Sequence, residues 1–293
     1  MHEILHIIEH SIIDWVKLIP FLFITYLLME YLEHHSQEIA EKILKRSGQF
    51  GALIGSALGL IPQCGFSSAA AGFYSARVIS LGTLVAVFLS TSDEMLPILI
   101  SNRVAPSLIF KILFTKFAIA LVAGFTIDLI LKAIYKKKEI NQESKIEEFC
   151  EREDCHCHHG IVKPALVHTL KVGGFILLVT LMLNLVIHFI GEENIANIIS
   201  NKSILASVLS AIVGIIPNCA SSVIVTELYA SGILSSGAML SGLLVNSGVA
   251  LAVLFRTNSP KRNTLKIILI LLAISIISGI IVDVTPIGQW LSM

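Results

Sequence analysis

Residues 59–67 read GLIPQCGFS, and 155 positions later residues 214–222 read GIIPNCASS. The two strings belong to a longer match, in which residues 59–128 align with residues 214–283 without a gap and are identical at 18 positions. The shared residues include Gly59/Gly214, Pro62/Pro217, Cys64/Cys219, Lys111/Lys266 and Asp128/Asp283. Such a match indicates an internal duplication, which in an apolar chain is typical of a transporter core.

The composition indicates a membrane protein. Hydrophobic residues make up 55% of the chain and charged residues 14%, against about 25% charged in an average soluble domain. At 50–76 and at 203–231, two shorter apolar stretches follow each other and are separated by Pro, an amide residue and Cys. A formal net charge of zero gives no reason to expect a nucleic acid partner. Apolar stretches of about 20 residues, the length that spans a bilayer, lie at 14–34, 80–101, 107–134, 165–190, 236–256 and 263–284.

Basic residues predict the topology. They cluster at 42–46, 132–163 and 256–266, and an excess of Lys and Arg predicts that these connections are cytoplasmic. The three basic connections can share one side only if each Pro-broken pair of short helices returns to the side from which it entered. Each repeat then crosses the membrane an odd number of times, so the second copy is inverted relative to the first. We therefore expect an all-α polytopic membrane protein with two inverted-topology five-helix repeats, each with a Pro-broken hairpin, and about ten membrane helices.

This topology predicts three regions. A first membrane repeat covers 1–135, a cytoplasmic Cys/His-rich linker covers 136–163, and a second, inverted membrane repeat covers 164–293. The amino terminus has no basic segment or cleavage site, so we do not interpret it as a signal peptide. We expect a multi-pass protein of the inner (cytoplasmic) membrane with both termini outside.

The two Pro-broken strings are the first candidate for a substrate site. Broken backbone at membrane depth is tolerated only where it is buried in protein or lines a wet cavity, and inversion would bring the two tips together near the midplane. A packing kink with buried cysteines is the alternative. The predicted ligands are Gln63, Cys64, Asn218 and Cys219, and the predicted structural breaks are Pro62, Gly65 and Pro217.

Asp93 and Glu94 lie near the centre of the apolar stretch 80–101. An acid at that depth costs about 2.5 to 3.5 kcal/mol, so a bound cation, a proton or a buried basic residue must compensate it. An ion pair with Lys116 is the structural alternative. The second copy has Gly248 and Val249 instead, which predicts a cation site that is acidic on one side only. The candidate ligands here are Ser92, Asp93, Glu94 and Asn246.

Other polar residues in apolar surroundings are further candidates. Glu227, inside the second hairpin, is predicted as a substrate ligand. Glu30 and His34 are four residues apart, so a helix places them on one face, where they could couple transport to a proton or ion. His188, the counterpart of His34, shares that prediction. For His34, the hydrated end of the helix is the alternative. Asp128 and Asp283 lie near helix ends, where we expect a surface role.

The linker carries the string EEFCEREDCHCHHG at 147–160. Thiolate and imidazole groups together suit zinc or copper(I), but this spacing matches no standard structural zinc site. An accessory metal-binding loop and a solvated segment are both open interpretations. The candidate ligands are Cys150, Cys155, His156, Cys157, His158 and His159.

The string IPQCGFSSAAAGFYSARVISLGTLVAVFLSTSDEMLPILIS, at residues 61–101, resembles the signature of the ten-helix heavy-metal exporter family, whose members are labelled manganese transporters or arsenic efflux proteins. The resemblance covers most of the chain and implies an inner-membrane exporter of a metal or metalloid. The family motif carries over to Pro62, Gln63, Cys64, Gly65, Ser92, Asp93 and Glu94, with Pro217, Asn218 and Cys219 in the second half.

The leading interpretation is a secondary transporter that exports a divalent heavy metal, manganese first, by proton exchange. Carboxylates and amides suit manganese, whereas two thiols favour softer ions, so arsenite or organoarsenical efflux through the Cys pair is the alternative. An intramembrane thiol oxidoreductase is disfavoured because the sequence has no C-x-x-C pair. We therefore expect that the protein is not an enzyme and has no permanently bound cofactor. The expected partners are the lipid bilayer and the metal ion, and a homodimer is left open.

Overall fold

The computed structural model describes residues 50–61, 64–92, 95–135 and 204–292, together with isolated positions within 9–27 and 162–182. Every element that runs through these four segments is a helix, which confirms the all-α prediction for this part of the chain. Several predicted residues lie outside the described residues: Pro62, Gln63, Asp93, Glu94, Glu30, His34, His188 and the linker ligands Cys150, Cys155, His156, Cys157, His158 and His159. For Cys64 and Cys219 only the backbone is described.

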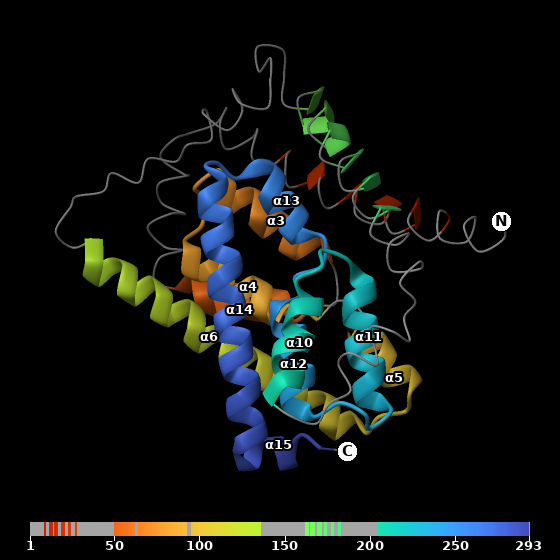
Figure 1. The fold of residues 1–293 in the computed structure, drawn as a ribbon. Coiled ribbons are helices and arrows are strands. Elements are labelled where there is room, and N and C mark those ends of the chain that lie inside the picture. The colour runs from red at the N-terminus through yellow and green to blue at the C-terminus, as the bar shows by residue number, and fades with distance from the viewer. Residues whose placement is uncertain are drawn as a thin grey trace.

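The two copies seen in the sequence form matching sets of helices (Figure 1). The first copy consists of a helix at Phe50–Gly59, α3 (Cys64–Ser75), α4 (Leu81–Ser90), α5 (Met95–Ser101) and α6 (Pro106–Tyr135). The second consists of α10 (Ile204–Gly214), α11 (Cys219–Ala230), α12 (Ser236–Val245), α13 (Ala250–Thr257), α14 (Lys261–Val284) and α15 (Pro286–Trp290). Counterparts α3 and α11 both have 12 residues, and α4 and α12 both have 10.

Each copy contains one more interruption than the sequence suggested. The apolar stretches 80–101 and 236–256 have the expected places, but each is divided into two short helices, with breaks after Ser90 and after Val245. In the second break the backbone leaves the helix at Asn246, with ψ 109°, and Gly248 has a φ of 56°, in the left-handed region that favours glycine. The centre of each copy is therefore built from half-helices.

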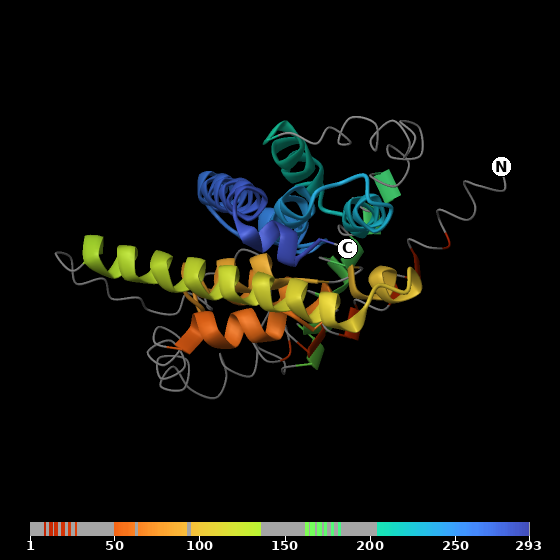
Figure 2. The same ribbon diagram turned by 90° about the horizontal axis from the view of Figure 1, so that it is seen from below.

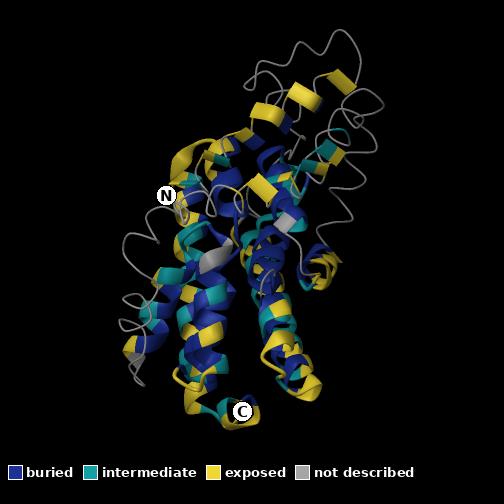
Figure 3. Cartoon of the chain, turned by 90° about the vertical axis from the view of Figure 1, so that its right-hand side faces the viewer, coloured by how far each residue is buried: buried dark blue, intermediate teal, exposed yellow. Residues whose placement is uncertain are grey.

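The unbroken long helices are mostly exposed, and the broken ones are mostly buried. Figure 3 shows how buried and exposed residues are distributed over the chain. In the part of the chain that the structure describes, four helical stretches are long and apolar enough to cross a membrane. In an 18-residue apolar segment of each stretch, 94% of Ser236–Thr257 is buried, against 17% of Pro106–Ile134 and 28% of Lys261–Val284. The exposed surface of α6 carries large apolar side chains such as Phe110, Phe114 and Phe125, which suits contact with lipid rather than water.

Each copy packs one of its helices on the short second half-helix of the other copy. Helix α3 of the first copy packs on α13 of the second, and α11 of the second packs on α5 of the first. Helices α4 and α12 touch each other at the centre. Figure 2 shows the two copies as neighbouring layers. In Figure 1, α14 runs from the top of the view to the bottom, whereas α6 rises from the lower centre to the left.

Matched aspartates tie the long helix of each copy to a half-helix. Asp128 on α6 accepts hydrogen bonds from the Gly82 backbone N–H at 2.9 Å and the Ser80 hydroxyl at 2.7 Å. Asp283 on α14 accepts the same pair from Gly237 and Ser235, both at 2.8 Å. These carboxylates satisfy donors at the first turns of α4 and α12. Asp283 is exposed, as the predicted surface role requires, and Asp128 is half-buried; in addition, both residues cap helices.

Glycines allow the same helices to approach closely. A Cβ on Gly82 would lie 2.2 Å from the carbonyl oxygen of Gly124, and one on Gly237 would lie 2.1 Å from that of Gly279. The tips of the hairpins show the same feature, since a Cβ on Gly59 would lie 2.0 Å from Ser90 Oγ. Small residues at such crossings are typical of helix packing in membranes.

We predict that Gly82→Ala destabilises the protein, because the added methyl group must displace backbone and the capping carboxylate of Asp128. Overpacking of this kind costs about 1 to 3 kcal/mol, which thermal unfolding in detergent would register as a lower Tm. Gly174→Ala is the matched control, because a Cβ there meets nothing within 4 Å. Equal Tm values for the two variants would contradict the close contact.

Candidate functional site

A small pocket lies where the two central breaks face each other. Its walls come from the break between α4 and α5, the break between α12 and α13, and the neighbouring α11. It has room for about one water molecule or ion. The lining residues are Thr91, Ser92, Met95, Ser222, Leu243 and Asn246. Of the predicted ligands, Ser92 and Asn246 are thus brought together.

The polar walls present oxygen atoms. Thr91 Oγ1 donates to the Val87 carbonyl at 2.8 Å, and Ser92 Oγ donates to the Ser90 carbonyl at 2.9 Å. Because each hydroxyl proton is engaged with backbone, the oxygen lone pairs remain for a ligand. Thr91 and Ser92 are both buried, so a ligand there would meet these atoms in place of bulk water.

Asn246 fixes the second break to the tip of the second hairpin. Its Nδ2 donates to Ser221 Oγ at 2.6 Å, and its Oδ1 accepts from the Gly248 N–H at 2.7 Å. Ser221 Oγ donates in turn to the Asn218 carbonyl at 2.8 Å. The predicted ligand Asn218 is therefore connected to Asn246 through one hydroxyl. Both asparagines are buried.

Serines that the sequence analysis did not select also belong to this region. Ser222 lines the pocket, and Ser221 joins the hairpin tip to the break. Ser247, which matches Ser92 in the first copy, is fully buried, and its hydroxyl has no hydrogen-bond partner in the described structure. Its carbonyl accepts from Ser67 Oγ of the other copy at 3.5 Å. The run of two serines after each P-[QN]-C string was the available signal.

A buried ammonium group lies at the edge of this pocket. Lys116, on α6, is 0% exposed. Its Nζ donates to the carbonyl of Leu243 at 3.1 Å and to the carbonyl of Thr91. Thr91 is the C-cap of α4, and Leu243 lies in the last turn of α12. The ammonium therefore lies between the carboxyl ends of two half-helices, where the helix dipoles are negative.

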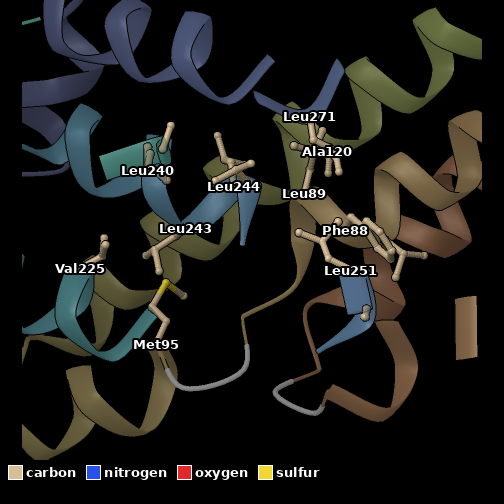
Figure 4. Close-up of a cluster of buried hydrophobic side chains, with 14 of the residues drawn as sticks. Phe88, Leu89, Met95, Ala120, Val225, Leu240, Leu243, Leu244, Leu251 and Leu271 are labelled. Atoms are coloured by element: carbon tan, nitrogen blue, oxygen red, sulfur yellow. The ribbon is translucent and has the colours of Figure 1, made fainter. Parts of the chain in front are cut away.

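Apolar side chains close the pocket on its remaining side. Met95 and Leu243 point toward each other from different copies (Figure 4), and both line the pocket. Leu271, on α14, is fully buried in the same hydrophobic cluster. This cluster surrounds the polar centre and limits its contact with lipid and water.

A family model described as "Putative, 10TM heavy-metal exporter" matches residues 4–187 and 164–292. The chain belongs to this family. The resemblance seen at residues 61–101 is thereby confirmed, and so are a multi-pass membrane protein and a transporter family rather than an enzyme family. No curated protein and no solved structure matches the chain.

Other predicted residues of this exporter-family protein lie at different places. Gly65 is buried in the first turn of α3, and Pro217 is half-buried just before α11. Glu227 is exposed on α11, where its Oε1 accepts a hydrogen bond from Asn102 Nδ2 at 3.1 Å, and it does not line the pocket. Within the described residues no three His, Cys, Asp or Glu side chains form a group that could hold a metal.

We predict that Asn246→Ala destabilises this exporter-family protein, because it removes the hydrogen bonds to Ser221 and Gly248 in a buried region. A buried polar group left unpaired costs about 1 to 3 kcal/mol, measurable as a lower Tm in detergent. Ser101→Ala is the control, since the Ser101 hydroxyl is exposed and bonds only locally to Ile98. A Tm loss of the same size in Ser101→Ala would argue against a specific role for Asn246.

Proposed function

We propose that this protein is a secondary exporter of a divalent heavy metal, with manganese as the first candidate. The observation that carries the proposal is the pocket at the two central breaks, whose polar wall includes Ser92. Asp93 and Glu94 follow Ser92 directly in the sequence, and the proposal assigns this acidic pair to the same site. Membership of a heavy-metal exporter family supports the class of substrate.

The donor set favours a hard cation. Thr91, Ser92 and Asn246, which carry hydroxyl and amide oxygens, line the pocket, and carboxylate and carbonyl oxygens are ligands that manganese accepts readily. In the proposal Asp93 and Glu94 supply the charge, and Gln63 and Asn218 approach from the hairpin tips. Cys64 and Cys219 are the first residues of α3 and α11. If these thiols rather than the carboxylates hold the substrate, arsenite efflux becomes the better interpretation.

We further propose that the two copies are inverted repeats that open alternately to the two sides. The reciprocal packing of α3 on α13 and of α5 on α11 supports this arrangement. The two helix pairs differ in their polar contacts. Between α3 and α13, Ser75 and Thr257 share a buried hydrogen bond of 2.8 Å, whereas Asn102, just after α5, and Glu227 on α11 meet at the surface. The proposal takes the first pair as the closed gate of this conformation and the second as the looser one.

The remaining features extend the same proposal. Glu30, His34 and His188 carry the returning proton, and the linker at 136–163 is an accessory metal-binding loop on the cytoplasmic side. Both termini face outside, in accordance with the distribution of Lys and Arg. Each of these assignments follows from sequence and is open to substitution experiments.

We predict that wild-type protein in proteoliposomes transports manganese and that Asp93→Asn reduces this transport by about tenfold or more, because the site loses a charge that compensates the cation. A panel of manganese, zinc, iron, copper, cobalt and arsenite identifies the substrate. The variant Cys64→Ser/Cys219→Ser is the matched comparison. Unchanged manganese transport in Asp93→Asn would exclude the carboxylate site. Arsenite transport that depends on the two thiols would favour the alternative.

We also predict that Ser75→Cys/Thr257→Cys forms a disulfide on oxidation and blocks transport, because the two hydroxyls already lie within bonding distance. Reduction should restore transport. The single variants Ser75→Cys and Thr257→Cys are the controls for the native cysteines. Full transport by the oxidised, cross-linked protein would show that this end does not need to open.

A further inference from the structure

Lys116 stands out because its charge is buried without being part of the repeated framework. Among the residues that the structure describes, it is the one basic residue in the buried class. An ammonium group removed from water costs several kcal/mol unless it is well compensated. The carbonyl oxygens of Thr91 and Leu243 contribute to that compensation. An ionisable side chain buried at membrane depth is a candidate for function.

The second copy shows that packing alone does not require this charge. The position that matches Lys116 is Leu271, which is fully buried on α14. The capping aspartates and the close glycine contacts occur in both copies. If Lys116 belonged to that framework, its counterpart would be expected to carry a similar group. Leucine at 271 indicates that the same helix contact can be filled by an apolar side chain.

The place of the ammonium group is one that suits a cation. The carboxyl ends of α4 and α12 converge on Lys116 Nζ, and each end carries about half a negative charge. In transporters with broken helices, such ends coordinate the transported cation. Thr91 and Leu243 provide the carbonyls and also line the pocket. The ammonium group and a cation in the pocket would therefore lie against the same two helix ends.

We propose that Lys116 is a tethered cation that compensates the carboxyl ends of α4 and α12 while the exporter is empty and withdraws from them when the exported ion binds. This inference rests on the proposed export function. After release of the metal, the metal-free site must open again to the cytoplasmic side, with the exchanged proton held elsewhere in the protein, and negative helix ends without a cation would oppose that step. The ammonium group lowers this barrier. When the divalent ion arrives, repulsion between like charges in a poorly screened interior drives the ammonium group away.

The proposal separates two kinds of transport. Net efflux requires the return of the empty protein, whereas exchange of metal for metal does not, because the protein is loaded in both directions. Lys116 should therefore be necessary for net efflux and dispensable for exchange. A merely structural lysine would affect both alike.

The experiment uses full-length protein in proteoliposomes with radioactive manganese as the probe. Net efflux is measured into metal-free buffer, and exchange is measured with unlabelled manganese outside. We expect Lys116→Leu, which introduces the residue found at 271, to reduce net efflux about tenfold or more while exchange stays within about twofold of wild type. Lys116→Arg keeps the charge and should retain more net efflux than Lys116→Leu. Lys111→Leu, on the same helix, is the control and should not change the ratio of efflux to exchange.

Each outcome decides between the possibilities. Loss of exchange together with net efflux in Lys116→Leu would overturn the inference, since it would assign Lys116 a structural role. Equal net efflux in Lys116→Leu and wild type would overturn it as well. If wild-type protein moves manganese in neither assay, manganese export itself is wrong, and the inference for this ion falls with it. That last result is distinguishable because it appears before any substitution is made.

Discussion

The architecture depends on one constraint, which is that backbone polar groups inside a bilayer must find partners within the protein. The outer helices α6 and α14 meet it by remaining unbroken over 30 and 24 residues. The central helices break at mid-length, so their ends need other partners. Asn246, Ser221 and Lys116 supply several of them through the bonds described above. The broken centre is therefore satisfied by polar side chains, whereas the outer helices satisfy their own backbone.

The duplicated parts and the unique parts of the chain serve different purposes. Glycine contacts and aspartate caps occur in both copies, and they determine how each long helix holds its half-helices. The residues around the pocket differ between the copies: Thr91 of the first copy corresponds to Asn246 of the second, and Lys116 corresponds to Leu271. A symmetric framework thus encloses an asymmetric centre. Directional binding needs such asymmetry, because two identical half-sites would offer a ligand the same groups from both sides.

Sequence reasoning predicted the large features because they depend on local composition. The duplication and the positions of the apolar stretches within the described segments follow from residue types at fixed spacing. The breaks after Ser90 and Val245 were missed, since the polar residues there are few and the surrounding hydropathy remains high. Asp128 looked like a surface residue for a related reason: its partner, Gly82, is distant in sequence.

Other parts of the site depend on orientation, which spacing alone does not determine. The predicted ligands Ser92 and Asn246 both line the pocket, whereas Glu227, predicted from its place inside an apolar segment, is exposed beside Asn102. The direction in which a short half-helix presents a side chain depends on its tilt and rotation against neighbours. Lys116 was considered only as a partner for an acid. Its bonds to two backbone carbonyls could not be inferred, because any residue type can supply a carbonyl.

The length of the half-helices has a further consequence for how a solute would travel. Helices α4 and α12 have 10 residues each, so at 1.5 Å per residue each is about 15 Å long. The hydrocarbon core of a bilayer is about 30 Å thick. With the half-helices along the bilayer normal, a particle at the breaks would be separated from either surface by about one half-helix length. Movement of a single layer of half-helices would suffice to connect it with one compartment, while the opposite layer continues to act as a seal.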